Sequence, residues 1–176
     1  VGGEFSNVGI SAPFGIPFSL TNDQVSNEAD HPNGAVYSSV SDGNGGWYIG
    51  GDFTAVGGQA RNRLAHIDST GQVKAWNPNV NGLVGTLLLR SDTLYVGGLF
   101  TEIDGEERLN LASFDVVSGN LTSWNPSPND QVESLKERDG IIYVGGRFDR
   151  FGKSGSNGAP LNQTTGQLDF SGASPD

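Results

Sequence analysis

The chain of 176 residues carries 20 acidic and 10 basic side chains, which give a net charge of −10, and it contains no cysteine and no methionine. The charge argues against nucleic acids and anionic membrane surfaces as partners. The lack of cysteine excludes disulfide bonds and thiol chemistry. No stretch approaches the roughly 20 apolar residues that span a bilayer, so we expect no membrane insertion. Because position 1 is not methionine, we expect a processed chain or a fragment of a longer one.

A motif of the form Tyr/Val-x-Gly-Gly-x-Phe recurs four times at almost constant spacing. Tyr48 and Tyr95 are 47 residues apart, and Tyr95 and Tyr143 are 48 apart. The four copies are Val1-Gly2-Gly3-Glu4-Phe5, Tyr48-Ile49-Gly50-Gly51-Asp52-Phe53, Tyr95-Val96-Gly97-Gly98-Leu99-Phe100 and Tyr143-Val144-Gly145-Gly146-Arg147-Phe148. The spacing predicts a single repeat region over residues 1–176, with units 1–47, 48–94, 95–142 and 143–176.

Four short strands are expected in each unit, joined by turns of Asn, Asp, Ser and Gly. The Tyr-x-Gly-Gly-x-Phe segment is the first strand, and the second covers residues 64–68 or 111–115. The third ends in Trp76-Asn77-Pro78 or Trp124-Asn125-Pro126, and the fourth covers residues 83–89 or 132–135. No window has apolar residues at helical spacing for three turns, and 27 glycines would penalise helix throughout.

These units predict an all-β protein, a β-propeller built from four-stranded antiparallel blades of about 47 residues. About four blades are covered, either as a small closed ring or as part of a larger propeller. A β-solenoid, whose coils are usually shorter, and a β-sandwich, which would not repeat, are the alternatives. Paired glycines inside a strand imply that a neighbouring backbone or ring approaches closely. The motif Phe and the Trp of Trp-Asn-Pro are expected to fill the space between blades.

The first and fourth units depart from the inner two. They have Gly-Ile-Pro-Phe at residues 15–18 and Gly-Ala-Pro-Leu at residues 158–161, where the inner units have Leu-Ala, and they lack the Trp and the Arg. Capping or ring closure is one explanation, since terminal repeats are often atypical. A higher-order repeat that continues beyond Asp176 is the other, and it favours a piece of a longer polypeptide.

The string from Asp42 to Thr54, followed by Val-Gly-Gly at 56–58, Arg61, Leu-Ala-His-Ile at 64–67 and Trp-Asn-Pro at 76–78, resembles the bacterial delta-sixty-type β-propeller repeats. This resemblance is specific in the second and third units. It implies a scaffold in a large secreted or cell-surface protein. Members of that family generally have no assigned catalytic residues, so the resemblance supplies none here.

The residues themselves offer no catalytic constellation. His31 and His66 have no second ligand at metal-binding spacing, which favours structural roles for both. No serine lies in a Gly-x-Ser-x-Gly elbow. The acidic run at residues 102–107 is expected to be a solvated hairpin, because glycoside chemistry needs two opposed carboxylates. We therefore predict no catalytic residues and no enzyme activity.

No cofactor is predicted, with calcium as the alternative at one loop. Asp42 and Asn44 alternate with glycines as at the start of a calcium loop, but the distal bidentate Glu is missing and an Asn-Gly hairpin turn explains the same residues. Asn120 and Asn162 each begin an Asn-x-Thr acceptor pattern, which matters only if the host glycosylates secreted proteins.

The residue between Gly-Gly and Phe changes from unit to unit while the frame is constant. It is Glu4, Asp52, Leu99 or Arg147. Variable positions and loops on a rigid scaffold are the usual place for binding. The leading hypothesis is thus a non-enzymatic, extracellular scaffold for adhesion that binds a protein or glycan surface ligand. The alternatives are a self-associating subunit of a surface filament or layer, and a propeller-type carbohydrate-active enzyme.

Overall fold

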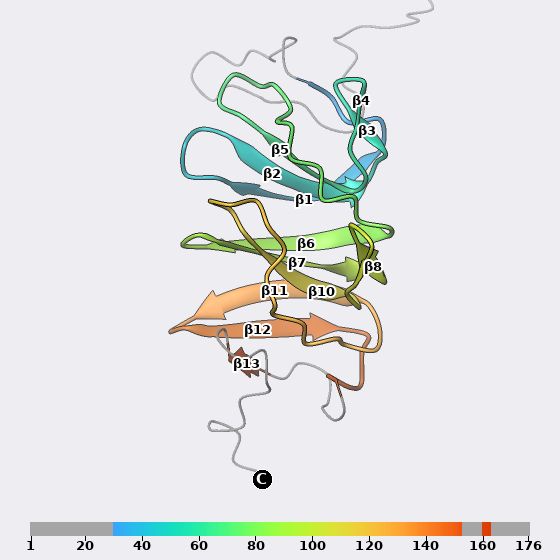
Figure 1. Ribbon diagram of the computed structural model, residues 1–176. Coiled ribbons are helices and arrows are strands. Elements are labelled where there is room, and N and C mark those ends of the chain that lie inside the picture. Colours follow the sequence, from blue (N-terminus) through green and yellow to red (C-terminus); the bar gives the residue numbers. More distant parts are fainter. Residues whose placement is uncertain (1–29, 153–159, 163–176) are drawn as a thin grey trace, which may run out of the picture.

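The computed structural model describes residues 30–152 and 160–162, and these contain strands and turns but no helix (Figure 1). Consequently, no helix of the described residues could cross a membrane. The strands are β1 (Ala35–Ser41), β2 (Trp47–Asp52), β3 (Ala55–Val56), β4 (Gln59–Ala60), β5 (Leu64–Ile67), β6 (Leu83–Arg90), β7 (Thr93–Leu99), β8 (Glu102–Ile103), β9 (Glu106–Glu107), β10 (Leu111–Asp115), β11 (Val132–Arg138), β12 (Ile141–Gly146) and β13 (Pro160–Asn162).

Three antiparallel sheets lie one above another in Figure 1, in the orders β1-β2-β5, β6-β7-β10 and β11-β12-β13. Strand β6 packs against β1 and β2 of the first sheet, and β11 packs against β6 and β7 of the second. Two small hairpins, β3–β4 and β8–β9, lie along the same side of the stack, on the right in Figure 1. Each sheet takes its first strand from the end of one sequence unit and its second from the start of the next. The all-β prediction and the antiparallel pairing are confirmed.

The paired glycines lie where two kinds of close contact occur. A Cβ on the first glycine would meet a valine of the following sheet: Val84 at Gly50, and Val132 at Gly97, where the separation would be 2.6 Å. A Cβ on the second glycine, at Gly98 for example, would collide with a backbone carbonyl of the partner strand. The partner strand has a β-bulge here in all three sheets, which brings its backbone nearer. The predicted close approach is confirmed, although the group facing the first glycine is a valine and not a ring.

Aromatic and aliphatic side chains fill the space between sheets, as predicted. Phe100 is buried in a cluster that joins the first sheet to the second, together with Tyr48, Val84 and Leu94. Phe148 has the same place between the second sheet and the third. Burial of such a side chain contributes roughly 1.5–3 kcal/mol. The stack is therefore held mainly by these inter-sheet clusters.

The third strand expected in each unit, which ends in Trp-Asn-Pro, is reduced to a single bridge. Ile67 pairs with Val73 in one unit and Phe114 with Leu121 in the next. One residue further, the Lys74 carbonyl accepts two hydrogen bonds from the Arg61 guanidinium, at 2.7 and 3.1 Å. A carbonyl engaged in this way is not available to extend a ladder. Arg108 binds the Thr122 carbonyl similarly at 3.1 Å, which gives the repeated arginine a structural role.

Three asparagines spaced by 48 residues fasten the segment that follows the motif Phe. The side-chain oxygen of each accepts the N–H groups of two successive residues at 2.8–3.0 Å. The side-chain amide of each donates to Thr54, Thr101 or Asp149 at 2.7–3.0 Å. These residues are Asn33, Asn81 and Asn129. Their spacing of 48 residues is within one residue of the spacing of the paired glycines, so the sequence carries a signal for them that the Tyr-x-Gly-Gly-x-Phe motif does not include.

Candidate functional site

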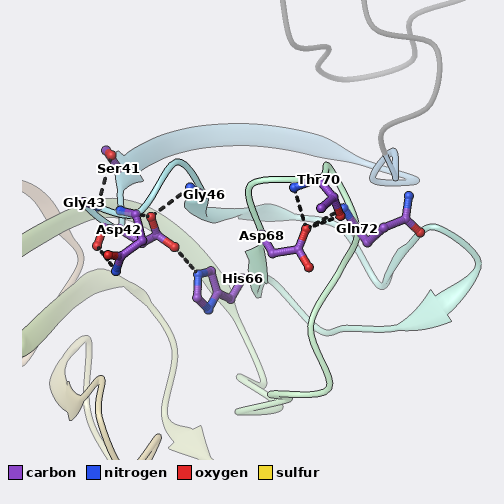
Figure 2. Close-up of polar contacts among 9 residues, drawn as sticks. Ser41, Asp42, Gly43, Gly46, His66, Asp68, Thr70 and Gln72 are labelled. Carbon is purple, nitrogen blue, oxygen red and sulfur yellow. Dashed lines mark hydrogen bonds and ion pairs between the residues drawn. The ribbon is translucent and has the colours of Figure 1, made fainter.

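The loop between β1 and β2 places a carboxylate against a histidine (Figure 2). Asp42 Oδ1 accepts the N–H groups of Asn44 and Gly46, both at 2.8 Å. Asp42 Oδ2 lies 2.8 Å from His66 Nε2 on β5, and both side chains are nearly buried. This pair joins residues 24 apart in the sequence, and the pairing of β2 with β5 brings them together.

The contacts of this pair change the pKa values of Asp42 and of the adjacent Tyr48. Burial by itself raises the pKa of Asp42, but the hydrogen bond from His66 and those from the Asn44 and Gly46 amides outweigh it, so the pKa lies below its usual value. Burial raises the pKa of Tyr48, and the Asp42 carboxylate raises it further. The Tyr48 ring stacks on His66 with centroids 4.2 Å apart. The Asp42 carboxylate thus holds a negative charge at the start of β2, next to the packed Tyr48 ring.

The calcium alternative places its ligands at Asp42 and Asn44, and the structure engages both in the turn itself. The two carboxylate oxygens of Asp42 are bonded to protein donors, and the Asn44 amide donates to the Asp42 carbonyl at 3.3 Å. Within residues 30–152 and 160–162, no group of three or more His, Cys, Asp or Glu side chains could hold a metal ion. The geometry favours the hairpin-turn interpretation.

Carboxylates stabilise the outer turns in a similar way. Asp68 Oδ1 accepts the Thr70 hydroxyl and amide at 2.6 and 2.8 Å and the Gln72 amide at 3.2 Å, as Figure 2 shows. The hydrogen bonds from Thr70 lower the pKa of Asp68. In the next unit the Ser118 amide and hydroxyl lower the pKa of Asp115. Both are turn-forming groups and not ligand sites.

Two surface cavities adjoin at Trp76, in the segment between the first and second sheets. The smaller, of about 210 Å³, is lined by Tyr48, His66 and Lys74 on one side and by residues 116–119 on the other. The larger, of about 460 Å³, is lined by Trp76, Asn77, Pro78, Ile103, Asp104, Glu106, Phe114, Gly119, Asn120 and Leu121. Trp76 and Gly119 line both cavities, and the indole Nε1 donates to the Gly119 carbonyl at 2.8 Å. This hydrogen bond forms the wall between them.

The acidic run forms the β8–β9 hairpin next to the larger cavity, as expected of a solvated hairpin. Glu102, Glu106 and Glu107 lie on its two short strands and Asp104 in its turn, and all four are exposed. Glu106 forms an ion pair with Arg108 at 3.1 Å.

The variable positions occupy equivalent places in the three sheets. Asp52 ends β2, Leu99 ends β7, and Arg147 directly follows β12, and all three are exposed. Asp52 lies 3.6 Å from Arg63, and Arg147 lies 2.9 Å from Glu133. Glu4, the fourth such position, lies outside the described residues. This row is at the opposite end of β2 from the Asp42–His66 pair.

The repeated antiparallel sheets, together with a match to a β-propeller family model, place this protein in the β-propeller class. A family model described as a domain of unknown function (DUF5122), β-propeller, matches residues 43–73. This segment runs from the β1–β2 loop to the bridge at Val73, so the chain is similar to that family over part of one blade, without β1. A comparison with curated proteins found no match.

Proposed function

We propose that this protein is a non-enzymatic scaffold of the cell surface or extracellular space, which binds a protein or glycan ligand and serves adhesion. The observation that carries the proposal is the row formed by Asp52, Leu99 and Arg147. These three exposed side chains differ in charge and polarity, yet they stand at one position of a frame whose glycines, phenylalanines and asparagines are constant. A constant frame with variable exposed positions is the usual arrangement of a binding face.

The proposal includes an extracellular location and membership of the delta-sixty-type repeat proteins. The resemblance to delta-sixty-type repeats supports a secreted or cell-surface bacterial protein. The net charge of −10 is consistent with a soluble surface and a ligand that is not polyanionic.

The experiment that tests this proposal is a binding screen of the whole chain against glycan and extracellular-protein arrays. A triple variant, Asp52→Ser, Leu99→Ser and Arg147→Ser, changes the row and leaves the frame intact. A ligand that binds the wild-type chain and not the variant supports the proposal. Turnover of a substrate by the purified chain would count against the proposal, and binding unaffected by the triple variant would count against this row as the binding face.

Self-association is a second candidate, favoured by one observation on the third sheet. Tyr143 is 45% exposed, whereas its equivalents Tyr48 and Tyr95 are 5% and 4% exposed. Among the described residues, Gly145 has only Ser134 near its Cβ position, at 3.8 Å, where Gly97 faces a valine of the next sheet. Within the described residues, this face therefore lacks the valine that fills the equivalent position in the other two sheets. Analytical ultracentrifugation over a wide concentration range tests it, and a monomer at every concentration would refute it.

A further inference from the structure

The larger cavity beside Trp76 has the size and position of a ligand site. Small-molecule sites in proteins usually have volumes of about 300–1,000 Å³. The volume of about 460 Å³ lies in this range, whereas the neighbouring cavity of about 210 Å³ does not. The larger cavity lies between the Trp76–Pro78 connection, the β8–β9 hairpin and the turn after β10, so three segments of the chain contribute to it.

The walls of this cavity are fixed by internal contacts. The Trp76 indole is held by its hydrogen bond to Gly119 and packs edge-to-face against Tyr48 and Phe114, with centroids 5.6 and 5.2 Å away. On the hairpin side, Arg108 connects Glu106 to the Thr122 carbonyl, each at 3.1 Å. A ligand would thus meet a preformed surface and lose little binding energy to reorganisation.

Three polar side chains of the lining have no hydrogen bond within the part of the chain that the structure describes. They are the amides of Asn77 and Asn120 and the carboxylate of Asp104. Other Asn and Asp side chains of the same repeats, such as Asn81 and Asp42, have their oxygens bonded to protein donors. The three lining groups supply donors and acceptors next to an aromatic ring.

We propose that this cavity binds a neutral sugar residue of a glycan. Asparagine amides and a carboxylate can hydrogen-bond neighbouring hydroxyl groups as donors and acceptors, and the exposed part of Trp76 gives an apolar surface for the C–H face of a pyranose ring. The carboxylates of Asp104 and Glu106 disfavour anionic ligands. The two amides and the Glu106–Arg108 pair make the site less suited to a bare cation. The inference rests on the proposed binding function, names one ligand class, and places that ligand in this cavity, whose lining includes none of the three row residues.

Saturation-transfer NMR of the whole chain with methyl glycosides of glucose, galactose, mannose and N-acetylglucosamine tests the proposal. Asp104→Gly removes the carboxylate from a turn residue with φ of 48°, a conformation that glycine adopts without strain. Asp139→Gly is the matched control, because Asp139 has φ of 53°, precedes a glycine in a hairpin turn and lies on the third sheet's loop. We expect Asp104→Gly and Asn120→Ala each to weaken binding of the preferred glycoside by about tenfold, the loss typical of one hydrogen bond to a charged or well-placed group. Asp139→Gly should bind like the wild-type chain.

The outcomes separate this inference from the proposed function. Glycoside binding could survive Asp104→Gly and Asn120→Ala but be lost in the triple variant of Asp52, Leu99 and Arg147. That result would overturn the cavity as the sugar site and leave the proposed binding scaffold standing. Binding of choline in place of every glycoside also overturns the inference, in favour of a cation site. No binding of any glycoside, with a protein ligand found on the array, overturns it and again leaves the scaffold.

Discussion

The contact between Gly97 and Val132 is expected to make alanine at position 97 destabilising. An alanine Cβ would lie 2.6 Å from the Val132 side chain and 2.8 Å from that of Thr86, inside a fully packed interface. Overpacking of this kind costs about 1–3 kcal/mol. A Gly→Ala change also restricts the unfolded chain, which returns about 0.4–1 kcal/mol where the backbone allows it. Gly97→Ala should therefore lower the free energy of unfolding by about 1–2 kcal/mol.

Gly145→Ala is the control, because Gly145 is the equivalent glycine of the third sheet and its Cβ would meet only Ser134 at 3.8 Å among the described residues. At Gly145 the alanine still reduces the conformational entropy of the unfolded chain but causes no overpacking, so we expect the free energy of unfolding to rise by up to about 1 kcal/mol. Urea unfolding followed by tryptophan fluorescence measures both variants. With an m-value of about 2 kcal/mol/M, the two midpoints should differ by roughly 1 M. Equal midpoints would refute the interpretation that Gly97 is packed against Val132 of the next sheet while Gly145 has no such neighbour among the described residues.

Three further predictions concern the repeated asparagine and the Asp42–His66 pair. Asn81→Ala leaves the amides of Thr101 and Glu102 without their acceptor and should reduce the free energy of unfolding by about 1–3 kcal/mol, measured in the same urea assay. The pKa of Asp42 is lowered in the folded chain, so its contribution to the free energy of unfolding is complete above the unfolded-state pKa of about 3.9 and is lost as the pH falls through the folded-state value. Asp42→Ala should therefore flatten the pH dependence of the free energy of unfolding below about pH 4, and an unchanged slope would contradict this. Because both Asp42 carboxylate oxygens are bonded to protein donors, calcium should leave the thermal unfolding midpoint unchanged, and a calcium-dependent rise in scanning calorimetry would restore the metal-site interpretation.

The repeat spacing was sufficient to predict the sheets, since glycines and aromatic residues at a fixed period indicate the same packing environment each time. It also predicted that a close contact occurs at each Gly-Gly pair. The length of the third strand of each unit could not be predicted in this way. A Trp-Asn-Pro segment is compatible with a strand, and only the position of the Arg61 guanidinium over the Lys74 carbonyl shows why the ladder stops after one bridge.

The candidate sites were hidden from sequence reasoning for a different reason. Asp42 and His66 are joined by strand register, and register depends on bulges and loop lengths that no local pattern gives. The Trp76 cavity is built from three segments, the Trp76–Pro78 connection, residues 103–106 and residues 119–121, whose proximity follows from the stacking of the sheets. The role of the three repeated asparagines could have been predicted, because Asn33, Asn81 and Asn129 recur at a spacing within one residue of that of the motif.

The comparison of equivalent positions separates structural from functional residues in this chain. Glycine, phenylalanine and asparagine recur wherever the frame needs them, so they need no ligand to explain them. Asp42 and His66 do not recur: the second sheet has the shorter turn at Ser91-Asp92 at the place of the Asp42 loop, and Ser113 at the place of His66. The Ser113 hydroxyl instead bonds that of Thr122 at 2.6 Å. Side chains that differ between blades while the frame is unchanged are the ones free to serve recognition. The exposed row consists of such side chains, and Asp104 and Asn120 bring two of them to the Trp76 cavity, where the preceding unit has Gly57 and Gln72.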